Sequence, residues 1–236
     1  QPQPDPYRSV VDAGLRLSKD ETIVRMPFEV RHMGSKYPIF SFDFTGAKRG
    51  VLPASYDYLR LEGRMQYRLN LPPIGYSQLM LEGGKIFGKV PYLLLKLHEG
   101  NGTYFYDRYA FSCMNFYEFS SDAWISFFYE HHFNGFLLGR VPLLKKLNWR
   151  EVFVFKGVYG TLSARNDGSL PNTKAVMLFP VGMSSVEHPY LETGFGIENI
   201  FRLLRVDCIW RLTHHRAVPG LSIPTFTVNF SLNLKF

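Results

Sequence analysis

The chain has 236 residues, of which 46% are hydrophobic and 16% aromatic, and its formal net charge is +7. This length suffices for a sizeable core, but a helical membrane protein is excluded because no stretch approaches the roughly 20 consecutive apolar residues of a spanning helix. Lysines and arginines are spread along the chain without a dense cluster, which argues against nucleic acid as a partner.

The first segments predict short strands after a polar start. Gln1 to Pro6 is too polar and too proline-rich for a signal peptide, so we expect either a processed protein or a fragment of a longer one. Strands are expected at residues 8–17, 22–32 and 38–46, where apolar and polar residues alternate with a period of two. The first of these has the weakest pattern.

A cleaner strand is predicted at residues 57–71, where leucines and other apolar residues fall on one face. The charged residues of the opposite face, which we expect to point inward, are Arg60, Glu62, Arg64 and Arg68. A soluble strand can expose such a face to water, whereas a membrane barrel turns it toward a polar lumen.

Further strands are expected at residues 75–88, 103–119 and 122–134. Two connections, 89–102 and 135–149, resemble each other because a Gly-basic-Val-Pro sequence, at 88–91 and at 139–142, is followed in both by leucines and lysines. Proline at the start of a short helix and a mixed Leu and Lys face suggest amphipathic turns at a membrane interface. The alternative is that both connections simply pack against the barrel rim.

The last part of the chain predicts two strands at 150–163 and 190–198 and a final hairpin within 201–236. Residues 164–189 between them are the longest segment without strand character and contain turn formers such as Asn166-Asp167-Gly168. In the first strand of the hairpin, the charged residues expected to face inward are Arg205, Asp207 and Arg211.

The final strand has the most regular alternation in the chain. Its apolar face consists of Phe226, Val228, Phe230, Leu232, Leu234 and Phe236. Because the strand ends the chain on an aromatic residue, we interpret these six as the C-terminal assembly signal of an outer-membrane barrel. A charge on this face should lower assembly, whereas changes at Asn229 or Asn233 on the other face should do far less.

Together these patterns predict an all-β fold: an antiparallel transmembrane β-barrel over residues 1–236, with about 10–11 strands in this chain. If the C-terminus is periplasmic, the strand order makes 164–189 a long external loop and puts 89–102 and 135–149 on the periplasmic side. An open edge in lipid would leave backbone groups unsatisfied, at a cost of several kcal/mol each. We therefore expect this chain not to close by itself but to be part of a larger barrel.

Residues 116–163, with the Tyr-Glu-His-His-Phe-Asn-Gly run at 129–135, resemble the barrel region of a family of Bacteroidota outer-membrane proteins. In that family a carboxypeptidase-regulatory-like domain precedes a barrel of unassigned function. The resemblance implies the C-terminal portion of a barrel similar to those of the surface-antigen superfamily, which includes the BamA-type assembly barrels. It also implies partners: outer-membrane lipid, the barrel-assembly machinery, and other envelope proteins or further strands of the same polypeptide.

One departure concerns the lid loop of assembly barrels, which carries an Arg-Gly-Phe-type motif above the sixth strand from the end. This chain contains no such motif, and the corresponding turn is predicted to be the short Ser120-Ser121 link. The absence argues against an insertase mechanism without affecting the predicted fold.

No arrangement of residues predicts catalysis, a cofactor or a metal. Glu130 and His132 would share one face of a strand and His131 the other, so they are expected to join a polar interior network rather than a catalytic centre. His214 and His215 have the same weakness as a metal pair.

The function expected from these features is that of a non-enzymatic component of the outer membrane of a Gram-negative bacterium, acting with partners in outer-membrane protein assembly or export. The alternative is a pore for small solutes. Opposed charges on the inner face favour a salt-bridged wall or plug over a selectivity filter. Cys113 and Cys208 have no neighbours at metal spacing and are interpreted as small hydrophobes.

Overall fold

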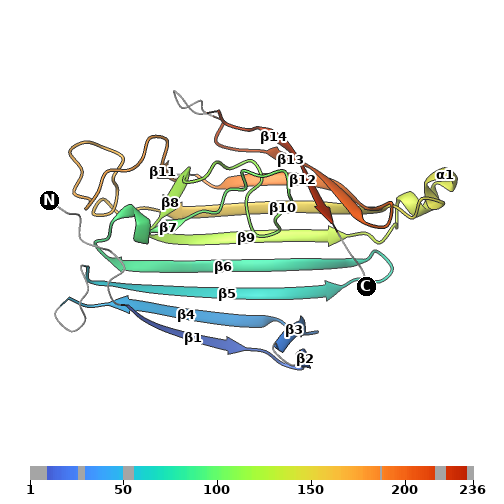
Figure 1. The fold of residues 1–236 in the computed structure, drawn as a ribbon, viewed down its shortest axis with the longest axis horizontal. Helices are drawn as coiled ribbons and strands as arrows, with labels where there is room; N and C mark the ends of the chain where they lie inside the picture. Colours follow the sequence, from blue (N-terminus) through green and yellow to red (C-terminus); the bar gives the residue numbers. More distant parts are fainter. Residues whose placement is uncertain (1–9, 26–29, 50–55, 187, 216–221, 233–236) are drawn as a thin grey trace.

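A computed structural model describes the chain except for residues 1–9, 26–29, 50–55, 187, 216–221 and 233–236. Its main feature is a nine-stranded sheet in which all neighbours are antiparallel (Figure 1). In their order across the sheet, the strands are β1 (Val11–Leu17), β4 (Ile39–Ala47), β5 (Tyr58–Asn70), β6 (Tyr76–Gly88), β9 (Ala123–His132), β10 (Arg150–Thr161), β12 (Tyr190–Ile200), β13 (Leu204–Arg211) and β14 (Phe226–Leu232). The predicted all-β, antiparallel class is therefore confirmed.

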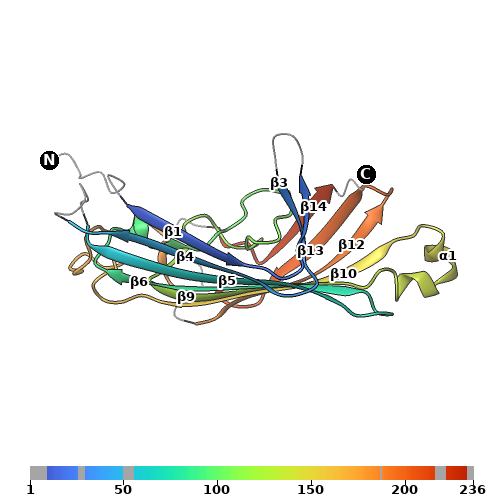
Figure 2. The same ribbon diagram turned by 90° about the horizontal axis from the view of Figure 1, so that it is seen from below.

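The sheet is curved (Figure 2). Its two faces differ in chemistry. The register continues the period-two alternation from strand to strand, so that Phe153, Phe195 and Cys208 share the convex face. Large apolar side chains are exposed there, for example Phe195 at 59% and Leu232 at 64%. Polar and charged side chains point to the concave face, where part of the chain covers them.

The smaller elements lie around the main sheet. They are a hairpin of β2 (Thr22–Arg25) and β3 (Val30–Gly34); a three-stranded sheet of β7 (Lys96–Leu97), β8 (Phe119–Ser121) and β11 (Ser184–Ser185); the 3-10 helices η1 (Tyr92–Leu94) and η2 (Leu138–Arg140); and helix α1 (Pro142–Lys145). No helix in the described part of the chain combines the length and the apolar character needed to cross a bilayer.

Two of the predicted strands are wrong. Residues 22–32 do not form one strand, because β2 and β3 pair antiparallel with each other; Pro27 lies in this stretch, and proline weakens a strand prediction. Residues 103–119 contain no long strand and instead bond to the concave face. The main sheet consequently has nine strands among the described residues instead of the predicted ten or eleven.

Because residues 103–119 are not a strand of the main sheet, the 89–102 connection lies at a different end of the sheet than predicted. Tyr76 of β6 pairs with His132 of β9 and Lys85 with Ala123, so 89–102 and 135–149 leave the sheet at opposite ends. Val90 N–H and Gly88 C=O bond to Asn166, which places the 89–102 connection at the same end as residues 164–189. The expectation that 89–102 and 135–149 share one side is therefore wrong.

The short Ser120-Ser121 link is likewise not a turn between spanning strands. The sixth strand from the C-terminal edge of the sheet is β6, and the connection that follows it runs from Lys89 to Asp122. This connection is long because its residues fold back over the concave face. At the two edges of the sheet, β1 and β14 do not pair with each other within the described residues, in line with the prediction that the chain does not close by itself.

Candidate functional site

Residues 98–118, which we call the inner segment, fill the concave face between β6 and β14 (Figures 1 and 2). Phe111 and Met114 of this segment are 1% and 2% exposed and pack in one cluster with Phe128 and Tyr190 of the sheet. The inner segment therefore supplies the core of the concave side. Its backbone groups still need partners, because buried N–H and C=O groups are costly when unpaired.

Three charged residues in register across neighbouring strands provide these partners. Lys156 of β10 is opposite Glu192 of β12, which is opposite Arg211 of β13. Lys156 Nζ donates to the carbonyls of Asp107 (2.8 Å) and Ala110 (2.6 Å). Because Lys156 and Glu192 are fully buried, their charges depend on each other and on the polar groups of the inner segment.

Glu192 and Arg211 bind the other half of the inner segment. The Glu192 carboxylate accepts hydrogen bonds from the N–H groups of Ser112 (2.8 Å) and Cys113 (2.7 Å). Arg211 Nη2 lies 2.5 Å from Glu118 Oε1, and its Nη1 donates to the carbonyl of Cys113 at 3.1 Å. We refer to Lys156, Glu192 and Arg211 as the charge ladder, and they fix the inner segment through its main chain.

A second polar cluster centres on Glu130 of β9, which is 1% exposed. Glu130 Oε2 lies 2.8 Å from Arg108 Nε, and Oε1 lies 3.2 Å from Arg205 Nη2 and accepts a hydrogen bond from the Tyr106 hydroxyl. Arg205 also pairs with Asp207 at 2.7 Å. Two residues of the inner segment, Tyr106 and Arg108, are thereby held by the sheet.

The two histidine residues of β9 point to opposite faces of the sheet, as the alternation along a strand predicts. His132 lies 3.4 Å from Glu130 and 3.1 Å from Glu198, so it extends the same polar network. His131 points to the other face and bonds to Ser77 Oγ at 2.8 Å. Among the described residues no group of three or more His, Cys, Asp or Glu side chains is placed to hold a metal ion.

The inner segment also reaches the last strand. Tyr106 N–H donates to Phe230 C=O and Phe230 N–H to Tyr104 C=O, both at 2.7 Å, so Phe105 and Phe230 form a parallel bridge. Asn229 Nδ2 donates to Thr103 C=O at 3.0 Å. These bonds use main-chain groups of Phe230 on the edge of β14 that faces away from β13, so part of this edge is occupied by the chain itself.

The bridge between Phe105 and Phe230 can be tested by cross-linking. With Cys113→Ser and Cys208→Ser removing the native thiols, the pair Phe105→Cys and Phe230→Cys is expected to form a disulfide under mild oxidation. Neighbouring strands lie about 4.7–4.9 Å apart, which is within the Cα separation of about 4.4–6.8 Å that a disulfide spans. Non-reducing gel mobility of the folded protein would report it. Phe105→Cys with Phe226→Cys is the matched control, and equal cross-linking of the two pairs would contradict the bridge.

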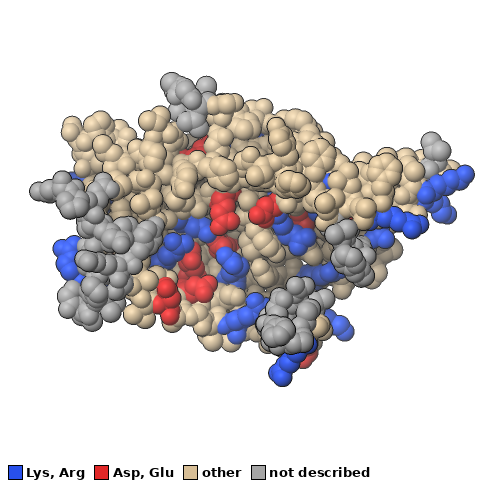
Figure 3. Space-filling model, viewed as in Figure 1, with Lys and Arg blue, Asp and Glu red and all other residues tan. Residues whose placement is uncertain are grey.

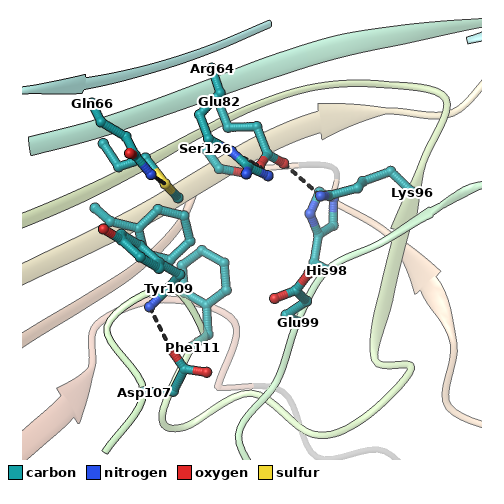
Figure 4. Close-up of a pocket in the computed structure, with 12 residues that line it drawn as sticks. Arg64, Gln66, Glu82, Lys96, His98, Glu99, Asp107, Tyr109, Phe111 and Ser126 are labelled. Atoms are coloured by element: carbon teal, nitrogen blue, oxygen red, sulfur yellow. Dashed lines mark hydrogen bonds and ion pairs between the residues drawn. The ribbon is translucent and has the colours of Figure 1, made fainter. Parts of the chain in front are cut away.

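A cavity of about 330 Å³ remains between the inner segment and strands β5, β6 and β9 (Figure 4). At one end Glu82 Oε1 pairs with Lys96 (2.5 Å) and Oε2 with Arg64 (2.7 Å). Burial, followed by the nearby Lys96 cation, lowers the pKa of His98 to about 3, so this imidazole is neutral near pH 7. The other end is lined by aromatic rings, including Tyr109 and Phe111.

Beyond this cavity the concave face is open. A hollow of about 1050 Å³ lies against β5 and shares Gln66 and Tyr109 with the first cavity. Figure 3 shows acidic and basic residues gathered in the hollow of this face. The inner segment therefore covers the C-terminal strands and leaves the β4–β5 side uncovered.

The seven charged residues that the sequence predicts to face inward fall into two groups in the structure. Arg205, Asp207 and Arg211 are at most 3% exposed and belong to the network around the inner segment. The residues of β5 form a partly exposed wall instead, with the predicted Arg60, Glu62, Arg64 and Arg68 on the concave side. Of these, Arg60 pairs with Glu62 at 2.6 Å.

The predicted terminal signal lies on the convex face as far as the structure describes it. Phe226 is 47% exposed, Phe230 39% and Leu232 64%, and Val228 is half-buried. Leu234 and Phe236 lie outside the described residues.

Sequence reasoning missed Lys156 and the contact residues of the inner segment. The available signal was Lys156 itself, a lone charge at an inward position in the apolar run Val152 to Val158. The two cysteines lie on different layers, Cys113 fully buried in the inner segment and Cys208 on the convex face, and both are free thiols. They behave as the small hydrophobes that the sequence predicts.

Most of the chain is similar to a known protein family. A family model described as the C-terminal domain of a family of unknown function (DUF5686) matches residues 8–164. No curated protein matches the chain. The matched residues span β1 to β10 and include the whole inner segment.

Proposed function

Since the chain belongs to the family of unknown function DUF5686, we propose that it forms the C-terminal part of an outer-membrane β-barrel in a Gram-negative bacterium and serves the envelope without catalysing a reaction. The apolar convex face supports the membrane assignment, because soluble proteins rarely expose large contiguous apolar patches. β5 and β6 have 13 residues each, β10 has 12 and β12 has 11, and about 9–11 suffice for a tilted strand to cross a bilayer.

The remaining strands of the barrel would pair with the outer edge of β1 and with the part of the β14 edge that the inner segment leaves unoccupied. Backbone groups left unpaired at a sheet edge cost several kcal/mol each in lipid, so an open sheet of this kind calls for further strands of the same polypeptide or of a partner. The uncovered β4–β5 side of the concave face would then border the strands that complete the barrel.

We propose that the barrel is closed to free diffusion by the inner segment, and that it acts with partner proteins in outer-membrane protein assembly or export. The observation that carries this proposal is the charge ladder: Lys156, Glu192 and Arg211 fix the inner segment through buried hydrogen bonds. We therefore expect the inner segment to stay on the concave face of the folded protein, because leaving it would break these buried hydrogen bonds.

The proposed kinship with surface-antigen barrels has support in the connection after β6. Assembly barrels carry their lid loop at the sixth strand from the end, and here residues 89–122 leave the sixth strand from the end and fold inward. Arg108 of this connection pairs with Glu130 of the wall, although no Arg-Gly-Phe motif is present. The position of this connection thus supports an assembly role, while the absent motif still argues against an insertase mechanism.

The alternative function, a pore for small solutes, is favoured by the two cavities that share Gln66 and Tyr109. Conductance in planar bilayers separates the two. The intact protein is expected to show little conductance, whereas replacement of residues 100–117 by a short Gly-Ser linker should produce stable open channels. Glu192→Gln, which keeps the chain length, should raise the frequency of opening. High, steady conductance of the unmodified protein would refute the closed barrel.

A further inference from the structure

One end of the sheet presents a surface that is both basic and apolar. It is formed by the connection after β9 and by the turn between β12 and β13, which are joined by a hydrogen bond of 2.8 Å from Asn199 Nδ2 to Asn148 C=O. We call this the basic end surface. Its members, all exposed, are Arg140, Lys145, Lys146 and Arg202 together with Leu137, Val141, Leu147, Phe201 and Leu203.

The positive charge of this surface is not balanced by exposed acids. Within residues 133–151 and 198–203 the only acidic residues are Glu151 and Glu198. The Glu151 carboxylate accepts the N–H of Leu138, and Glu198 is 6% exposed and bonded to His132. Figure 3 shows the resulting cluster of basic atoms at the end where α1 lies.

The apolar side chains of the same surface are unusually exposed for their type. Phe201 is 86% exposed, Leu137 51% and Leu147 48%. Arg140 stacks its guanidinium over the Phe136 ring at 4.1 Å, which keeps the cation beside apolar surface. A surface that combines exposed apolar and basic side chains suits the boundary between acyl chains and headgroups. Apolar groups enter the lipid there, and cations stay at the headgroup level.

From this chemistry we infer that the basic end surface binds the headgroups of anionic phospholipids in the leaflet at this end of the sheet. The inference rests on the proposed membrane location. The acyl chains would contact Leu137, Leu147 and Phe201, and the phosphate-bearing headgroups would contact Lys145, Lys146 and Arg202. Each basic residue near an anionic surface contributes about 1 kcal/mol, which is about a fivefold change in binding.

The test uses the full-length protein in bilayers of equal parts phosphatidylglycerol and phosphatidylcholine. Native mass spectrometry of the released protein gives the ratio of the two lipids that it retains. We expect phosphatidylglycerol to be enriched on the unmodified protein, and the variant with Arg140, Lys145, Lys146 and Arg202 all replaced by glutamine to lose most of this enrichment.

The matched control removes four exposed basic residues from the opposite end by replacing Lys48, Lys89, Arg165 and Lys174 with glutamine. This control should keep the enrichment. Insertion without enrichment, or equal losses in both variants, would overturn the lipid inference alone. Protein that is washed from the vesicles at alkaline pH would instead refute the proposed membrane function, and the inference with it.

Discussion

Replacing Glu192 with alanine is expected to lower the free energy of unfolding by about 3–5 kcal/mol and to release the inner segment, because it removes the central member of a buried charge ladder. Glu192 is fully buried and lies opposite Lys156 and Arg211 in the neighbouring strands. Its loss leaves two N–H groups of the inner segment without acceptors and removes the acid that lies opposite the buried Lys156, while Arg211 keeps its ion pair with Glu118.

Cys113 provides the measurement, since it lies in the inner segment and is fully buried. Burial, followed by the nearby Glu192 carboxylate, raises the pKa of its thiol to about 12, so almost no thiolate exists near neutral pH. In a Cys208→Ser background, release of the inner segment should expose Cys113 and return its pKa toward the ordinary value. Maleimide labelling at pH 8 should therefore become much faster.

The control for this experiment is Glu62→Ala. Glu62 pairs with Arg60 at 2.6 Å, but both side chains are about a quarter exposed, so the loss should stay below about 1 kcal/mol. Urea titration in lipid vesicles, followed by tryptophan emission, gives the unfolding free energies. If Glu192→Ala left both the stability and the labelling of Cys113 unchanged, the charge ladder would not be what holds the inner segment.

Replacing Phe230 with aspartate is expected to reduce the amount of folded protein in the outer membrane sharply. The Phe230 side chain lies on the convex face of β14 and is 39% exposed. On a lipid-facing strand position, a charge near the bilayer midplane costs about 2–4 kcal/mol, somewhat less for aspartate than for arginine. Heat-modifiable gel mobility would measure the folded fraction in membranes.

Ser231→Asp is the matched control on the neighbouring residue. Ser231 faces the concave side, and its register partner in β13 is Arg205, so an acid there meets a cation instead of lipid. Folding should be little affected. Equal losses from both substitutions would show that the convex face does not contact lipid.

Asn229 is not the tolerant position that the sequence suggested. Alternation placed it on the polar face, where change was expected to do far less than on the apolar face. In the structure Asn229 is fully buried and donates to Thr103 C=O of the inner segment. A polar residue on the concave face can therefore be as constrained as a core residue when a distant segment packs against it. Asn233 lies outside the described residues.

Local alternation along the chain was enough to predict the all-β class and the approximate bounds of most long strands of the main sheet. Residues 57–71 and 225–236 show why: in an extended chain successive side chains point to opposite faces, so their assignment depends only on neighbours in the sequence. The same reasoning separated Glu130 and His132 from His131.

What covers the concave face depends on contacts between segments that lie far apart in the sequence. Residues 103–119 have the aromatic-rich composition of a strand, but their partners are side chains far along the chain, such as Glu192, which bonds to Ser112 across 80 residues. No local pattern encodes such a pairing, because its stability comes from joining Lys156, Glu192 and Arg211 after three separate strands have come into register. Counting residues 103–119 as a strand also led to the wrong predicted end for the 89–102 connection. Successive strands of a meander run in opposite directions, so one extra strand reverses the predicted side of every connection that precedes it.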